Sequence, residues 1–216
     1  MQKKATTNRW TLSDHLKGKM MESSTKTIPT SLQTIYPKNK LGKFIFHLPI
    51  YAWRLGLGPI VGRYIMIITH TGRKTGFSRH TAVEYHRLGG IKYIPCAFGF
   101  QAQWYRNIMA NPRVTIQTAE GTEHMVAVRV TRDEELVLVI QSILKRNPTL
   151  MNWYLQSLGV EPTETDILAH KEHLIFLRFD PTNEPAPRGL EVDLAWIWPL
   201  IMLWMFISRP FRHKRK

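Results

Sequence analysis

The chain has 216 residues, of which 44% are hydrophobic, and its formal net charge is +14. This length favours one domain with a substantial core, and the single cysteine excludes an intrachain disulfide. The charge lies at the ends, because residues 1–43 carry a net +7 and residues 209–216 a net +5. A nearly neutral body argues against a nucleic-acid reader, whereas basic tails favour an anionic membrane surface.

Two segments precede the first predicted strand. Residues 1–40 are rich in Lys, Thr and Ser without sustained periodicity, which predicts a disordered tail with a short helix around residues 13–21. They contain no apolar run followed by a small-residue cleavage site, so they do not look like a secretory signal. Residues 41–61 are apolar and aromatic but interrupted by Pro and Gly, which predicts a short amphipathic helix. Such a helix either packs on the domain or lies on a membrane.

The middle of the chain alternates strand signals with turns, and it predicts an α+β, mainly β, fold: a small barrel of about six antiparallel strands with flanking helices. Gly89-Gly90 predicts a hairpin turn, and Gly121 separates another strand pair. The predicted strands are residues 63–69, 78–86, 91–97, 113–118, 123–130 and 173–179. The predicted helices are residues 103–110, 132–145 and 151–158.

A basic turn joins the first two predicted strands. Gly72 and Gly76 stand four positions apart, and the turn region carries the cations Arg73, Lys74 and Arg79. Since like charges repel, their grouping favours a bound anion, most simply a phosphate; the alternative is a solvated hairpin tip. The turn is neither a Walker A loop nor a Rossmann fingerprint, because it leads into a strand and not into a helix.

The C-terminal segment, residues 194–207, is uncharged and is followed by five Lys or Arg residues. A helix of this length reaches about 21 Å, short of the roughly 30 Å of a bilayer core, and Pro199 interrupts it. Trp196, Trp198 and Trp204 together with the basic end predict an interfacial membrane anchor. The alternative is a helix packed on the barrel or on a partner subunit.

Three ordered motifs resemble the deazaflavin-dependent nitroreductase family, whose members reduce quinones and nitro compounds with reduced coenzyme F-420. The resemblance covers residues 41–180 and implies a split β-barrel related to the FMN-binding oxidoreductases. Each motif alone is modest evidence for the family, but the three motifs in this order and spacing are specific to it. The motifs are Thr69-His70-Thr71-Gly72-Arg73-Lys74-Thr75-Gly76 with Arg79, then Ala97-Phe98-Gly99, then Trp104-Tyr105-x-Asn107-x-x-Ala110-Asn111-Pro112-x-Val114.

The resemblance also implies which residues hold the cofactor. The basic residues of the turn would bind its phosphate and acidic tail, the strand after Arg79 would lie along it, residues 95–98 would meet the ring, and the helix at 103–107 would close over it. The implied residues are Arg73, Lys74, Thr75, Arg79, His80, Thr81, Ala82, Val83, Pro95, Cys96, Ala97, Phe98, Gln103, Trp104, Tyr105 and Asn107. For Trp104, Tyr105 and Asn107 the alternative is core packing and a helix cap.

Other residues are more loosely matched. Tyr154 resembles family tyrosines that could donate a proton or orient a substrate, and its alternative is a packed tyrosine. Ala97 stands where several relatives carry serine, and the loop 99–104 is short, so acceptor choice could differ. His170 and His173 lie three apart without an obvious third ligand, so we expect no metal.

The resemblance implies an oxidoreductase that transfers a hydride from reduced F-420 to a quinone, nitro or enone-type acceptor. One alternative is a reductase that binds FMN, or a barrel that holds another flavin or a tetrapyrrole-like ligand; another is a non-enzymatic, membrane-associated carrier of cofactor or lipid. We expect a tail at residues 1–40, a cofactor-binding domain at 41–182 and a membrane-associating segment at 183–216. The predicted location is the cytoplasm, at the inner membrane surface; the sequence leaves open whether the chain forms a homodimer.

Overall fold

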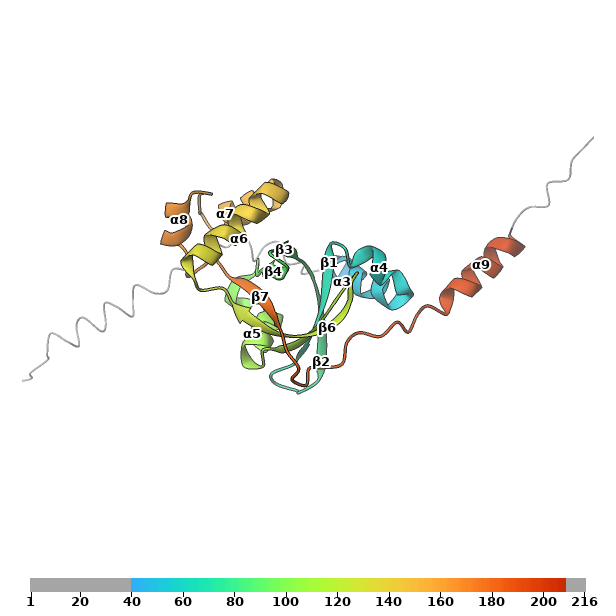
Figure 1. The fold of residues 1–216 in the computed structure, drawn as a ribbon. Helices are drawn as coiled ribbons and strands as arrows, with labels where there is room; N and C mark the ends of the chain where they lie inside the picture. Colours follow the sequence, from blue (N-terminus) through green and yellow to red (C-terminus); the bar gives the residue numbers. More distant parts are fainter. Residues whose placement is uncertain (1–39, 209–216) are drawn as a thin grey trace, which may run out of the picture.

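The computed structural model describes residues 40–208, with side chains from residue 44 onward; the helix expected around residues 13–21 lies outside this range. A single antiparallel sheet curls into a barrel, with α6, α7 and α8 grouped on one side and α3 and α4 on the other (Figure 1). The prediction of a mainly β barrel with flanking helices is therefore confirmed. The sheet, however, contains seven strands.

The strand order is β2-β1-β5-β6-β7-β4-β3, so β2 and β3 are the two edges of the sheet. Every neighbouring pair of strands runs antiparallel, as expected for strands joined by short turns. The strands are β1 (Ile65–Thr71), β2 (Ser78–Glu84), β3 (His86–Leu88), β4 (Ile91–Pro95), β5 (Arg113–Thr118), β6 (Gly121–Arg129) and β7 (Phe176–Pro181).

The extra strand arises because the predicted run 78–86 divides at Tyr85. The chain leaves β2 at one edge of the sheet and enters β3 at the other, so this residue crosses the opening of the split barrel. The Tyr85 hydroxyl donates a hydrogen bond to the carbonyl of Gly62 at 3.0 Å, and its backbone N–H donates to the carbonyl of Tyr64. Alternating polarity looks the same on both sides of such a corner, so the sequence pattern did not reveal it.

Two hydrophobic cores flank the sheet. The barrel interior is filled by side chains of the inner strand faces, including Met66, Ile68, Ile116 and Leu177, and by α5 (Gln103–Ala110). The second core lies between the sheet and the helices α6 (Asp133–Arg146), α7 (Pro148–Ser157) and α8 (Glu164–Ala169). The short α8 was not predicted. Helix α7 begins before the predicted Met151, because the Asn147 side chain caps it and Pro148 occupies its first turn.

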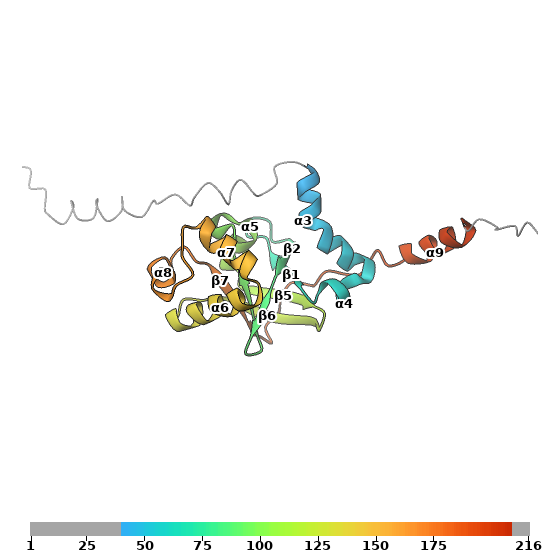
Figure 2. The ribbon, with the colours of Figure 1, turned by 90° about the horizontal axis from the view of Figure 1, so that it is seen from above.

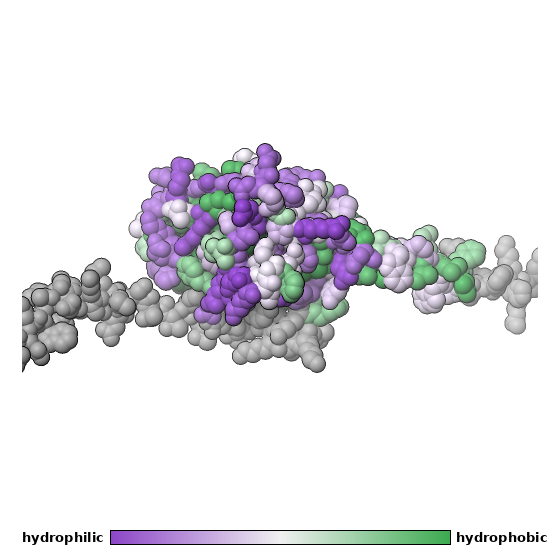
Figure 3. Space-filling model, turned by 90° about the horizontal axis from the view of Figure 1, so that it is seen from below, coloured by the Kyte–Doolittle hydropathy of each residue, from purple (hydrophilic) through white to green (hydrophobic). Residues whose placement is uncertain are grey.

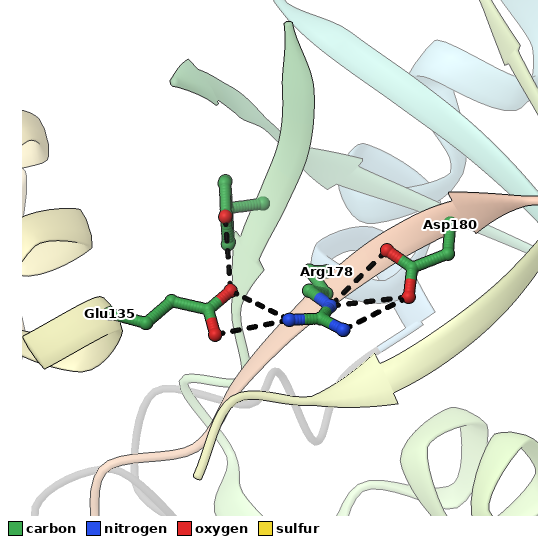
Figure 4. A network of polar contacts seen from close by, with 4 residues as sticks. Glu135, Arg178 and Asp180 are labelled. Atoms are coloured by element: carbon green, nitrogen blue, oxygen red, sulfur yellow. Dashed lines mark hydrogen bonds and ion pairs between the residues drawn. The ribbon is translucent and has the colours of Figure 1, made fainter. Parts of the chain in front are cut away.

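A charged network fixes α6 against the sheet (Figure 4). Arg178 of β7 donates to both carboxylate oxygens of Glu135 in α6, at 3.1 and 3.2 Å, and contacts Asp180 on its own strand. The Tyr93 hydroxyl of β4 donates to the same Glu135 at 3.1 Å. Burial, followed by its contact with Glu135, raises the pKa of Tyr93, so this hydroxyl keeps its proton.

The N-terminal apolar run folds into three pieces and not into one helix. They are α3 (Lys40–Ala52), a π-turn at Trp53–Leu57 and α4 (Gly58–Val61). The chain kinks at Gly56, where φ is +86°, a value that favours glycine. Trp53 is buried, so this end of the run is attached to the barrel. Within the described residues, Phe44–Val61 is the one helical stretch that passes a test of length and apolar composition for a membrane span.

After β7, the chain runs back across the barrel as an extended strap, residues 182–196, and ends in α9 (Ile197–Ile207). Gln117 of β5 exchanges two hydrogen bonds with the backbone of Leu190, at 2.7 and 3.0 Å, and Arg113 pairs with Glu184 at 2.8 Å. Helix α9 stands away from the barrel (Figures 1 and 2). Pro199 does not interrupt it, because the first helical turn needs no amide donor there.

Candidate functional site

The cationic turn, residues 72–79, joins β1 to β2 and exposes all three of its cations. The amide N–H of Gly72 donates to the carbonyl of Phe77, and that of Gly76 donates to the carbonyl of Gly72, both at 2.8 Å. Gly76 has φ +71°, and a Cβ at Gly72 would lie 3.0 Å from the Thr75 hydroxyl oxygen. The two glycines therefore allow a turn that a bulkier residue would strain.

Arg73 does not point freely into solvent, because helix α5 holds it. Its guanidinium donates from Nη1 to Asn107 Oδ1 and from Nη2 to Gln103 Oε1, each at 2.9 Å. Its backbone N–H donates to the same Asn107 oxygen at 3.2 Å. Lys74 and Arg79 have no ion-pair partner among the residues that the structure describes. They are the two cations available to an outside anion.

A buried histidine continues this network into the barrel. Asn107 Nδ2 lies 3.4 Å from His70 Nδ1, and His70 Nε2 lies 3.2 Å from the Thr81 hydroxyl. Asn107 is only 8% exposed and His70 only 2%. The chain Thr81–His70–Asn107–Arg73 thus fixes the turn relative to α5. Asn107, expected beside the cofactor ring, makes all of its described contacts inside the protein.

The burial of His70 has a consequence for stability. Loss of hydration, reinforced by nearby His80, lowers the pKa of His70 to about 4 from 6.5. Between these two values the unfolded chain binds the proton and the folded chain does not, so stability falls as the pH falls from 6.5 to 4. We expect a loss of up to about 3 kcal/mol in the free energy of unfolding across this range. Urea unfolding at a series of pH values measures it.

His70→Gln should flatten this dependence, and His124→Gln, on the exposed part of β6, is the matched control. His80 and His86 also have pKa values lowered chiefly by burial, so a weaker slope of the same sign should remain in the His70 variant. An identical slope in wild type and His70→Gln would contradict the assignment of the acid-sensitive step to this residue.

The expected ring-binding strand, residues 80–83, presents two different faces. Thr81 and Val83 pair with Ile68 and Met66 of the barrel core, and Val83 packs against that core. His80 pairs with Thr69 on the opposite face, where Thr69 Oγ1 lies 3.0 Å from His80 Nδ1. Since side chains alternate along a strand, Ala82 shares the face of His80. The structure therefore groups Arg79, Thr81 and Val83 and separates them from His80 and Ala82.

The face of His80 borders a different cavity, of about 410 Å³. Its walls come from α3 and the π-turn (Ile50, Arg54), from β2 (Ser78, His80) and from the strap, residues 188–193. This cavity lies across β2 from the barrel core. A planar cofactor ring at the barrel opening would therefore not contact it.

The residues predicted to contact the cofactor ring also fall into two groups. Phe98 and Trp104 are half-buried and pack against the barrel core, as do Val83 and Tyr85; we call Phe98 and Trp104 the aromatic wall. Tyr105 is buried and makes edge contacts with Trp104 and Phe100. Pro95 is half-buried at the end of β4.

Two of the predicted ring contacts are not part of this wall, although Cys96 belongs to the same barrel core. Ala97 packs instead against the helical core. Cys96 is buried, its Sγ donates to the Gly99 carbonyl, and burial raises the pKa of its thiol to about 12. The thiol is therefore protonated and unreactive at neutral pH.

Tyr154, expected as a proton donor, is a core side chain. It is 3% exposed, lies among α6, α7 and β7, and packs edge-on against Phe176 with ring centroids 5.9 Å apart. Burial, followed by the nearby Cys96, raises its pKa. Tyr154 therefore matches the second possibility, a tyrosine packed in the core. A hydroxyl enclosed there cannot reach an acceptor at the barrel opening.

We expect Tyr154→Phe to leave turnover unchanged and to keep or raise the thermal midpoint. The hydroxyl is buried without a hydrogen-bond partner among the described residues, and an unsatisfied polar group costs stability. Thermal unfolding and steady-state rates measure both effects. A turnover rate lowered by about 100-fold or more, with an unchanged midpoint, would restore Tyr154 as a proton donor.

Sequence reasoning gave no role to His70 or Tyr85, although His70 lies within the first motif and Tyr85 within the strand 80–86 that was expected along the cofactor. An apolar strand interrupted by one histidine next to a glycine turn is the signal that could have marked it. His170, considered as a metal ligand, contacts Asp166 at 3.2 Å beside α8. Within residues 40–208 no group of three His, Cys, Asp or Glu side chains is placed to hold a metal ion.

Comparison with known proteins gives a match to one family model. Residues 55–155 match the family model described as F-420H(2)-dependent quinone reductase. No curated protein is similar enough to the chain to count as a relative. Similarity to solved structures is found at low sequence identity.

Three of these structures illustrate the similarity. An F-420-H2-dependent reductase, FDR-A, is 18% identical with a TM-score of 0.43, over 55% of this chain and 95% of its own. The heme storage protein HutZ from Vibrio cholerae is 16% identical with a TM-score of 0.42, over 68% and 98%. A chain described as a domain-swapped dimer is 17% identical with a TM-score of 0.42, over 55% and 81%.

Proposed function

We propose that this chain, whose residues 55–155 match the F-420H(2)-dependent quinone reductase family model, binds coenzyme F-420 and reduces a lipid-soluble quinone. The observation that carries the proposal is that α5, which holds the cationic turn through Arg73, also carries Trp104 of the half-buried aromatic wall. Lys74 and Arg79 offer charge to a phosphate, while Phe98 and Trp104 offer apolar surface to a planar ring.

The donor set fits the cofactor at its charged end. The Lys74 ammonium, the Arg79 guanidinium and the Thr75 hydroxyl would hold the phosphate and acidic tail, since all three side chains are exposed on one short turn. Arg73 would fix the position of the turn, because Asn107 and Gln103 hold its guanidinium against α5. Thr81 and Val83 would border the ring on the core face of β2.

When bound, reduced F-420 supplies a hydride, that is, two electrons and one proton. The chain's part is to hold the ring against Phe98 and Trp104, to exclude water on the core side and to orient the acceptor. A quinone that accepts the hydride needs one further proton to become the hydroquinone. No residue of the described site is required as a covalent nucleophile.

In this proposal residues 41–182 form the cofactor-binding unit, and residues 183–216 associate with the cytoplasmic surface of a membrane. The basic tails support this location, because anionic lipids attract clustered Lys and Arg. The exposed apolar surface of α9 supports it too, since nothing among the described residues covers that helix. A membrane location would favour a quinone over a water-soluble nitro or enone acceptor.

The test is oxidation of reduced F-420 by the purified full-length protein in detergent, followed by absorbance. We expect turnover with a quinone that exceeds the rate with nitroaromatic and enone acceptors. Faster turnover with the nitro or enone compounds would overturn the assignment to quinones. Tight binding of F-420 without turnover on any acceptor would favour the carrier function instead.

A further inference from the structure

Two apolar helices, α3 and α9, are exposed on this molecule. On α9, the side chains from Leu200 to Ile207 are 39–74% exposed. On α3, Phe44, Ile45, Leu48 and Tyr51 are 38–58% exposed. Figure 3 shows hydrophobic residues along the extension that carries α9, beside a largely hydrophilic body. Burying one Leu, Ile or Phe side chain contributes about 1.5–3 kcal/mol, so water is an unfavourable surrounding for both helices.

The two helices are joined at their roots, although they are far apart in the sequence. Arg54, just after α3, makes a two-pronged ion pair with Asp193 of the strap, at 2.6 and 2.7 Å. The Trp198 indole of α9 donates to the carbonyl of Leu55 at 2.7 Å. The backbone N–H of Leu194 donates to the carbonyl of Arg54 at 3.0 Å. These contacts link the start of α9 to the kinked end of α3.

Basic residues flank each helix in the sequence, at its end remote from this junction. Lys38 precedes α3, Lys40 and Lys43 belong to its first turn, and five Lys or Arg residues follow α9. Each helix therefore combines an apolar surface with positive charge at its far end. That combination matches an anionic bilayer, where side chains enter the acyl boundary and cations meet phosphate groups.

We propose that α3 and α9 form one membrane-binding platform, joined through Arg54–Asp193 and Trp198–Leu55, that lies in the surface of an anionic bilayer. The inference rests on the membrane association proposed above and extends it from the C-terminal segment to both helices. Together the helices orient the barrel on the membrane, as a single anchor would not.

Neither helix is arranged to cross the bilayer. The eleven residues of α9 reach about 16 Å, roughly half of the hydrocarbon thickness. The stretch Phe44–Val61 would be long enough if straight, but it kinks at Gly56. Its C-terminal end stays with the barrel, because Trp53 is buried and Arg54 is paired with Asp193. Lying in the interface is the arrangement these constraints permit.

Flotation of the full-length protein with vesicles tests the platform without any cofactor. The vesicles contain phosphatidylcholine alone or with about 30% phosphatidylglycerol, a composition chosen for roughly physiological charge. The variants are Phe44→Glu/Leu48→Glu on α3 and Ile201→Glu/Phe206→Glu on α9. Leu138→Glu, an equally exposed leucine of α6, is the matched control.

We expect tight binding to the anionic vesicles, a loss of about 10-fold or more for each helix variant, and wild-type binding for Leu138→Glu. Asp193→Asn breaks the ion pair that joins the two helices. It should weaken vesicle binding several-fold, because two membrane-binding helices bind more tightly when they are held together. Glu184→Gln, which breaks the Arg113 pair elsewhere on the strap, should have no effect.

The outcomes separate the two proposals. If the α9 variant loses binding and the α3 variant binds like wild type, the platform is overturned and a single C-terminal anchor remains. If wild type floats with neither vesicle, both the platform and the membrane association fail, while the cofactor assignment stands. A concentration-dependent dimer that both helix variants dissociate, without vesicle binding, would overturn the platform and identify a second copy of the chain as the occupant.

Discussion

Removing the two free cations of the turn, in Lys74→Ala/Arg79→Ala, is expected to weaken the binding of oxidised coenzyme F-420 by about 100-fold or more. A hydrogen bond to a charged group contributes about 1.5–3 kcal/mol, and the variant removes two donors at once. Because both side chains are exposed and neither has an ion-pair partner among the described residues, the fold should be unaffected. Titration followed by cofactor fluorescence measures the affinity.

The control removes the same charge elsewhere. Arg132→Ala/Lys145→Ala takes two exposed cations from the ends of α6, so it lowers the net charge equally without touching the turn. Its affinity for F-420 should match wild type. Equal weakening in the two variants would mean that overall charge, and not the cationic turn, attracts the cofactor.

Asn107→Ala is expected to have the second large effect, on both stability and affinity. The change leaves Arg73 and buried His70 without their shared partner, at a cost of about 2 kcal/mol in the free energy of unfolding. It also frees the turn from α5, so F-420 affinity should fall about 10-fold although the cations remain. Urea unfolding and cofactor titration give the two values.

Asn107→Asp tests whether Asn107 acts by holding Arg73 in place or by contacting the cofactor directly. An aspartate oxygen can still accept from both Arg73 donors, so affinity should recover most of the way to wild type. Asn111→Ala, four residues further along, removes contacts with Thr71 and Arg113 but none with Arg73, so it should change affinity little. If Asn107→Ala binds F-420 like wild type, the turn does not need α5 to hold it.

The barrel could be predicted because its strands alternate regularly between glycine turns, and helix α6 because its first turn is acidic and its end basic. The corner at Tyr85 and the course of the strap could not. Both depend on contacts between residues far apart in the sequence, such as Gln117 with Leu190, which leave no local pattern.

The sequence did not reveal how the side chains of the candidate site are oriented. The sequence predicted that residues 80–83 lie together along the cofactor. The strand alternation instead turns His80 and Ala82 to the face opposite the barrel core. The sequence also placed Tyr154 beside an acceptor, although the packing of α7 on β7 buries it. A sequence motif shows which residues are present, but the register of the sheet determines which of their side chains lie together.

In the proposed function, the cationic turn and the aromatic wall together hold a deazaflavin. Parallel titration of the purified full-length protein with oxidised F-420 and with FMN tests it most directly, since both ligands carry a phosphate and differ in the ring and tail. We expect saturable, micromolar binding of F-420 and weaker binding of FMN. Tighter binding of FMN, or no binding of either ligand, would contradict it.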